Sequence, residues 1–141
     1  MDNYYNTSHR MYKSSKTLHS NQEYHNSCYL AGYVVECYAK IIIGLSYGLN
    51  STDLKEFGHD LKKMRKEFQY IFSHSSFSSY MLDIPTDFSK ISLGTTKWNP
   101  MNRYSDITNE WIEVNSNDYQ NEMLFAMQKI TQMKLDGHNL I

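Results

Sequence analysis

Two side chains of opposite charge, Glu36 and Lys40, interrupt the most apolar stretch of the sequence. Residues 28–44 read CYLAGYVVECYAKIIIG. On a helix an acid and a base at this spacing face each other one turn apart. A helix that is apolar on all sides has to be enclosed, so we expect the pair to be shielded from water. Two interpretations stay open here: a structural ion pair, or a site in which Lys40 contacts a phosphate while Glu36 orients it.

Other combinations of reactive residues are weaker. His25 and Cys28 are spaced to share a helix face as metal ligands. No third ligand is evident, so we predict a buried thiol at Cys28, with no metal and no cofactor. Cys28 and Cys37 fall in one predicted helix, where they cannot reach each other to form a disulfide. The sequence contains no Ser–His–Asp order, zinc-ligand spacing or Walker motif.

Helical periodicity governs the first half of the chain. Residues 1–20 form a predicted amphipathic helix, with His9, Arg10, Lys13 and Lys16 on its wet side. A second helix is predicted from an N-cap at Ser20 or Asn21, with Glu23 in its first turn, to Leu45. Its stop signals are Gly44, Gly48 and Asn50.

Glycines lie in the same row as the charged pair. Cys28, Gly32, Glu36, Lys40 and Gly44 follow one another at steps of four, so they share one face of the second helix. A glycine inside a helix costs about 1 kcal/mol relative to alanine. We therefore predict that a backbone or an aromatic ring approaches closely at Gly32 and Gly44.

The second half alternates clear helices with irregular chain. A turn of helix is expected at Ser51 or Thr52, and an amphipathic helix over residues 57–72 with Asp60 in its first turn. Residues 73–102 are predicted to contain a short helix or to pack as a cap. A turn or short helix carrying Trp111 and Ile112 precedes a last helix, which opens at Ser116 or Asp118 and closes at 136–137. The buried seam of this last helix is predicted to be Tyr119, Met123, Ala126, Ile130 and Met133.

These elements predict one all-α domain over residues 1–141, an antiparallel up-and-down bundle of four to five helices with residues 73–102 as an irregular or short-helix insertion. A net charge of −1 argues against binding nucleic acid by bulk charge alone. The N-terminal residues lack signal-peptide character, and no uninterrupted apolar run approaches the ~20 residues of a membrane helix. A cytoplasmic location is expected.

Three segments in order resemble one family. They are residues 29–40 (YLAGYVVECYAK), residues 58–61 (GHDL) and residues 103–106 (RYSD). Together they resemble the HEPN superfamily (higher eukaryotes and prokaryotes nucleotide-binding domain): its AGY-x-x-E-x-x-x-K helix, the His-x-Leu that begins its next long helix, and its Arg-Tyr-Pro-Asp motif. Ser105 stands where the family usually has proline.

The resemblance implies a helical bundle, commonly a homodimer. Family members are RNA-cleaving toxins, RNA-processing enzymes, or non-catalytic modules that bind nucleotides or RNA. Many bacterial members work beside a nucleotidyltransferase partner as a toxin–antitoxin pair. The nucleotide- or RNA-binding candidates that the matching positions suggest are Glu36, Lys40, His59, Arg103, Tyr104 and Asp106.

The family's ribonuclease signature is missing. Ribonuclease members carry an arginine, four to six further residues and then a histidine, which moves protons at the 2′-hydroxyl while arginine stabilises charge on phosphorus. After Arg103 the eligible positions hold Thr108, Asn109 and Glu110. Arg10 and Arg65 have their next histidines too far along the chain. We therefore predict a non-catalytic module that binds a nucleotide, RNA or a protein partner.

Alternatives remain for several of these residues. An atypical metal-independent ribonuclease toxin would use Arg103 with His59 from another helix; a purely structural, antitoxin-like partner is a third possibility. A structural polar cluster of Glu36, Lys40, His59 and Arg103 is favoured over a ligand site. Tyr104 is predicted to pack rather than to stack on a base. The basic residues between 62 and 66 are predicted to form a solvated face rather than a track for a phosphate backbone.

Overall fold

The predicted all-α helical bundle is confirmed. The structure is a computed structural model of the whole chain, and it describes residues 3–81, 88–93, 97–105 and 111–141. The long helices are α1 (Tyr4–Ser20), α2 (Tyr24–Tyr47), α4 (Leu61–His74) and α5 (Glu113–Leu135). The short ones are α3 (Ser51–Leu54), η1 (Lys55–Phe57), η2 (Ser76–Met81), η3 (Ser89–Leu93) and η4 (Pro100–Tyr104). No strand occurs in these described ranges.

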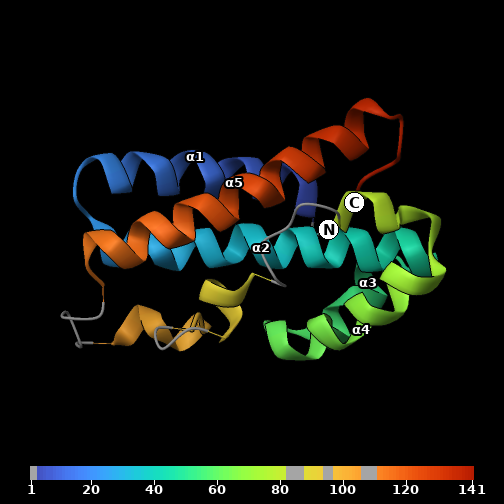
Figure 1. Cartoon of the computed structure of the whole chain (residues 1–141), viewed down its shortest axis with the longest axis horizontal. Coiled ribbons are helices and arrows are strands. Elements are labelled where there is room, and N and C mark those ends of the chain that lie inside the picture. Colours follow the sequence, from blue (N-terminus) through green and yellow to red (C-terminus); the bar gives the residue numbers. More distant parts are fainter. Residues whose placement is uncertain (1–2, 82–87, 94–96, 106–110) are drawn as a thin grey trace.

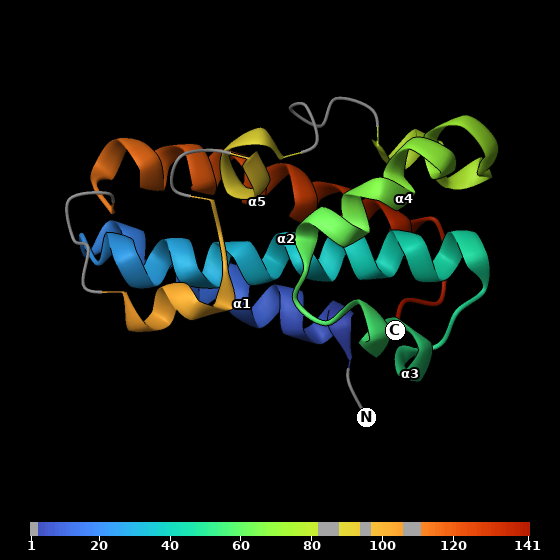
Figure 2. The ribbon, with the colours of Figure 1, turned by 90° about the horizontal axis from the view of Figure 1, so that it is seen from below.

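Helix α2 is the axis of the bundle, with α1 and α5 packed along it (Figure 1). Seen from below, η4 and α3 lie under α2 on the side of α1, and η3 lies on the side of α5 (Figure 2). Helix α1 runs antiparallel to α2, whereas α5 runs in the same direction as α2. Gln120 near the start of α5 therefore meets Ser27 near the start of α2. After α4 the chain returns to the end at which α2 begins.

Small polar residues fix the contact between α1 and α2. The Ser15 hydroxyl donates to the Ser27 carbonyl at 2.7 Å, and the Ser27 hydroxyl donates to the Ser15 carbonyl at 2.7 Å. The Gln120 side-chain amide donates to both hydroxyls. Both serines are fully buried, so their small side chains let the two helices approach closely while every hydroxyl is satisfied.

Helix α2 is enclosed almost all the way round, as its composition predicted. By length and composition it could cross a membrane, the one such helix among the described residues, with a mean hydropathy of 1.4 in its most apolar stretch. Of that stretch 78% is buried inside the bundle, as in the core helix of a soluble protein. The sequence prediction concerned uninterrupted apolar runs, which stop at Glu36 and Lys40; α2 reaches this length only when those two charged residues are included.

Several predicted helix ends need correction. The N-cap of α2 is Glu23, not Ser20 or Asn21, because Asn21 ends α1 and Gln22 adopts a left-handed φ of 62°. Helix α4 starts at Leu61 and is capped by Asp60, whose side chain accepts from the Lys63 amide. Helix α5 starts at Glu113, three residues before Ser116. The predicted C-terminal stop of α2 is confirmed at Gly48, in the left-handed conformation.

The buried faces agree with the periodicity. The predicted wet side of α1 is exposed, and all five predicted seam residues of α5 are buried. In α4 the buried residues are Leu61, Met64, Phe68 and Ile71. Phe72 departs from this pattern and is 55% exposed, because Ile71 already occupies the core position of that turn.

Residues 73–102 contain the predicted short helices and pack as a cap over the bundle; 82–87 and 94–96 lie outside the described residues. Phe88, Ile91 and Trp98 are buried against the helices. The Glu122 carboxylate of α5 accepts from the amides of Lys90 and Ile91 at 3.0 and 2.8 Å. Burial raises the pKa of Glu122, and these amides partly offset that effect. Glu122 thereby ties η3 to α5.

Both cysteines are free and buried, as predicted. Burial raises the pKa of Cys28 and of Cys37 to about 12. Since the thiolate is the reactive form, we expect neither thiol to react with Ellman's reagent at pH 8 in the native protein, and both to react after unfolding in urea. A folded pKa above the unfolded one also means that this contribution to stability is complete below about pH 9 and is lost as the pH rises toward 12. Rapid labelling of the native protein would contradict this burial.

Candidate functional site

The Glu36 carboxylate holds two basic side chains at once. Its Oε1 accepts from the Lys40 Nζ at 2.9 Å, and its Oε2 lies 2.8 Å from the His59 Nδ1. Only 6% of each of the Glu36 and Lys40 side chains is exposed, compared with 52% for His59. The predicted shielding of the Glu36–Lys40 pair is confirmed, and His59 connects this buried pair to solvent.

The turn before α4 presents His59 to α2. Gly58 takes a φ of 56°, a conformation that side chains disfavour, and Asp60 then caps α4. His59 therefore lies in the sharp turn between η1 and α4, opposite Glu36. An ionised carboxylate only accepts hydrogen bonds, so Nδ1 carries the proton and Nε2 is the ring nitrogen left for another partner.

A cleft of about 370 Å³ opens beside this cluster. Helix α1, the middle of α2 and the turn before α4 each contribute to its wall. The Lys40 Nζ lies 5.2 Å from the centre of the Tyr4 ring, a cation–π contact at the base of α1. The cleft is lined by Tyr4, Thr7, Met11, Tyr33, Glu36, Cys37, Lys40, Lys55, Gly58 and His59.

Tyr33 is the functional candidate that the sequence analysis missed. Its ring lies edge-on to His59 at 5.6 Å and edge-on to Trp98 at 4.9 Å, and its hydroxyl is bonded to that of Tyr29. Burial raises the pKa of Tyr33 above its ordinary value, Tyr29 and Glu36 add to the rise, and Arg103 opposes it. The phenol therefore stays protonated at neutral pH and can donate a hydrogen bond. Its place in the AGY motif was the only signal for it.

Gly32 has the close neighbour that was predicted. Atoms of the Trp98 ring lie 2.1–2.2 Å from the position that a Cβ at residue 32 would occupy, so only glycine fits. The Trp98 Nε1 donates to the Tyr29 carbonyl at 2.8 Å. At Gly44 the nearest atom would be the Leu54 Cδ1, at 3.1 Å. Trp98 is thereby held on α2 next to Tyr33, whose ring lines the cleft.

Arg103 and Tyr104 lie on η4, near this face of α2 but on the surface. Both are exposed, Tyr104 by 73%, and the Arg103 guanidinium lies 5.8 Å from the Tyr104 ring centre. Among the described residues, no hydrogen bond or ion pair joins Arg103 to Glu36, Lys40 or His59. The predicted cluster of four is therefore a cluster of three, and Tyr104 is not packed as predicted. Asp106 lies outside the described residues.

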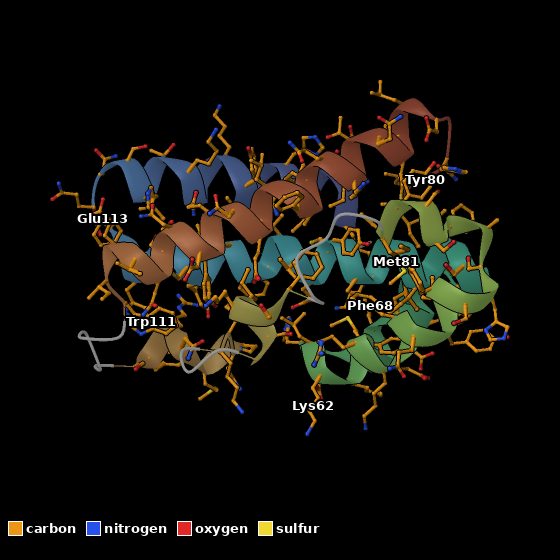
Figure 3. All side chains as sticks on the ribbon, viewed as in Figure 1. Lys62, Phe68, Tyr80, Met81, Trp111 and Glu113 are labelled. Atoms are coloured by element: carbon orange, nitrogen blue, oxygen red, sulfur yellow. The ribbon has the colours of Figure 1, made fainter. Side chains whose placement is uncertain are left out.

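The remaining candidates have ordinary surroundings. The basic side chains of α4 form the predicted solvated face: Lys62, Lys63 and Lys66 are exposed and Arg65 is half-buried, with Lys62 pointing away from the bundle (Figure 3). His25 Nε2 lies 2.6 Å from the Asn102 carbonyl, and the Cys28 thiol is buried. Within the described ranges no three His, Cys, Asp or Glu side chains are placed to hold a metal ion.

The fold and the site together define an all-α bundle with a buried Glu–Lys pair, extended by histidine, at the bottom of an open cleft. No family model, curated protein or solved structure matches this chain. The geometry of the cleft and the three short motifs are the features of this chain that bear on its function.

Proposed function

We propose that this protein is a HEPN-like helical module that binds a nucleotide or the phosphate of an RNA in the cleft, without cutting it. One observation carries the proposal. Lys40 of the motif helix and His59 of the second motif both contact the carboxylate of Glu36, and all three residues line the cleft. His59 comes from a different segment of the chain than Glu36 and Lys40. The predicted polar cluster included these three residues together with Arg103, which lies outside it. A cytoplasmic homodimer, acting beside a nucleotidyltransferase partner, is part of the same proposal.

The chemistry of the cleft suits an anion flanked by a ring. The Lys40 ammonium has three N–H donors and uses one in its hydrogen bond to Glu36. The others are available to a phosphate oxygen. Lys55 adds a second ammonium at the exposed rim. Tyr33 and Tyr4 supply aromatic walls, on which a base can stack. Glu36 already holds Lys40 and His59 in place, so that little conformational entropy is lost when a ligand binds.

A matched pair of lysine variants tests this site. Lys55 lines the cleft, whereas Lys62 lies on the outer face of α4, and both are exposed. We expect Lys55→Gln to weaken the binding of ATP or a short RNA by about threefold to tenfold, since one charge-assisted contact is lost. Lys62→Gln, the control with the same change of charge, leaves affinity within about twofold for a single exposed charge outside the site. Calorimetric titration at two salt concentrations measures both.

The alternative, an atypical ribonuclease, has its own supporting observation. Glu36 holds His59 so that Nε2 faces away from it, the arrangement of an oriented general base. The Tyr33 ring lies edge-on to His59, and the charge of Arg103 is close enough to Tyr33 to lower its pKa. Arg103 and His59 could thus flank one phosphodiester.

Cleavage assays separate the two candidates. Purified protein incubated with mixed RNA is expected to leave it intact, and expression in a host cell is expected to be harmless. Cleavage that is lost in both His59→Ala and Arg103→Ala, but kept in Lys62→Gln, would replace the binding proposal by the ribonuclease. Failure of every tested nucleotide and RNA to bind would overturn the proposal directly.

A further inference from the structure

Helix α5 has a second regular face, opposite its buried seam. Residues at alternating steps of three and four follow this face along the helix, and none of them is charged. We call them the outer stripe: Val114, Asn117, Asn121, Leu124, Gln128, Thr131 and Leu135. All are exposed, the three apolar members by 65%, 41% and 76%. Figure 2 shows α5 along one side of the bundle. This spacing is typical of a contact between two helices.

The outer stripe is symmetric about its middle. Leu124 lies at the centre, Val114 and Leu135 lie at the two ends, and the positions between them hold uncharged polar side chains. A helix that packs antiparallel on its own copy pairs residues that are equally far from the centre. To within one position, Leu124 then faces itself and Val114 faces Leu135 of the second copy, while amide and hydroxyl groups meet between them.

The charges beside the outer stripe favour the same orientation. The acidic residues of α5 all come before Leu124, and its lysines come after it. By helical spacing, Asp118 and Lys129 lie along one edge of the stripe, and Glu113 and Lys134 along the other, each pair nearly equidistant from the centre. An antiparallel pair therefore brings each acid to a lysine of the second copy, whereas a parallel pair brings like charges together.

Within the chain these edge charges make only loose contacts. Asp118 lies 4.0 Å from the Lys90 Nζ, and the Lys134 Nζ lies 5.2 Å from the centre of the Tyr5 ring. Such exposed contacts contribute little to stability. The side chains can therefore turn toward a second copy at small cost.

We infer that the outer stripe is the contact between two copies of this chain, packed antiparallel about a two-fold axis at Leu124. The inference rests on the homodimer of the proposed function and gives that dimer its surface. The stripe is about 32 Å long and about 10 Å wide, which is small for a stable interface, so we expect a dissociation constant in the micromolar range. The residues that line the cleft all come from outside α5, so both clefts stay open in this dimer.

Sedimentation equilibrium of the full chain tests the contact. From about 1 to about 300 µM, on either side of the expected dissociation constant, the average mass should rise from 16.6 kDa toward twice that value. Leu124→Glu places two like charges on the axis and should raise the dissociation constant more than about tenfold. Phe72→Glu makes a similar change on an exposed part of α4 and should leave it within about twofold. Circular dichroism confirms that both variants are folded.

Disulfide trapping tests the orientation. Under a mild oxidant Leu124→Cys should form a covalent dimer, because two introduced thiols meet on the axis, while the native thiols are buried. Val114→Cys and Leu135→Cys should each stay monomeric alone and cross-link when the two proteins are mixed. In a parallel pair Val114→Cys would cross-link with itself. Phe72→Cys, exposed on α4, controls for random collision and should not cross-link.

The dimer and the cleft can fail separately. ATP binding should be unchanged in Leu124→Glu, and a chain that dimerises as described without binding ATP leaves this inference standing. A mass that stays at 16.6 kDa over the whole range overturns it together with the homodimer. A dimer that persists in Leu124→Glu, or in which Val114→Cys cross-links with itself, overturns the inference alone and assigns the homodimer to another surface.

Discussion

Replacing Glu36 with leucine is expected to lower the free energy of unfolding by about 3–5 kcal/mol, because it leaves the Lys40 charge buried without an acceptor. The side chains of this pair are 6% exposed, so solvent cannot take the place of Glu36. Urea denaturation at pH 7 measures the loss as a lower midpoint at an unchanged slope. Since a domain is stable by only about 5–15 kcal/mol, this variant is close to unfolding.

A double variant shows whether charge is the cause. Glu36→Leu combined with Lys40→Met replaces the ion pair by apolar groups of similar volume, and should recover most of the lost stability. His59→Gln should cost less than about 1 kcal/mol, since that side chain is half exposed and its contact is screened. If the double variant were as unstable as Glu36→Leu alone, the loss would come from packing, and the ion pair would not be the cause.

The candidate site was predictable where its residues follow a helical period. The spacing of the residues from Cys28 to Gly44 placed Glu36, Lys40 and Gly32 on one helix face from the sequence alone, because four residues make about one turn. The apolar surroundings indicated that the pair would be shielded. The seam of α5 was predictable for the same reason, since its spacing repeats over several turns.

The rest depended on contacts that no local period encodes. Trp98 reaches Gly32 from an irregular segment, and Tyr4 reaches Lys40 from another helix. The sequence indicated that something would pack on Gly32, but no period identified Trp98 as the partner. Arg103 was placed with the cluster on the strength of a motif alone, and the structure leaves it on the surface. The N-cap of α2 was misplaced because Gln22 adopts a left-handed conformation that its residue type does not announce.

The contact between Gly32 and Trp98 leads to the second large effect. Gly32→Ala is expected to destabilise the fold by about 2–3 kcal/mol, although alanine favours a helix over glycine by about 1 kcal/mol. The added methyl would overlap the indole ring, which is held by its bond to the Tyr29 carbonyl and cannot move aside freely. Urea denaturation measures the loss, and tryptophan emission should shift to the red as Trp98 becomes exposed.

Gly44→Ala is the matched control within the same helix row. There the nearest atom is the end of the Leu54 side chain at 3.1 Å, which can rotate away, so the change should stay within about 1 kcal/mol of neutral. Trp98→Ala alone should cost about 3–5 kcal/mol. In that background Gly32→Ala should become stabilising, because the obstructing ring is gone and only the helix propensity remains. If Gly32→Ala were destabilising with or without Trp98, the ring would not be the reason for the glycine, and the segment that follows Trp98 would need another anchor on α2.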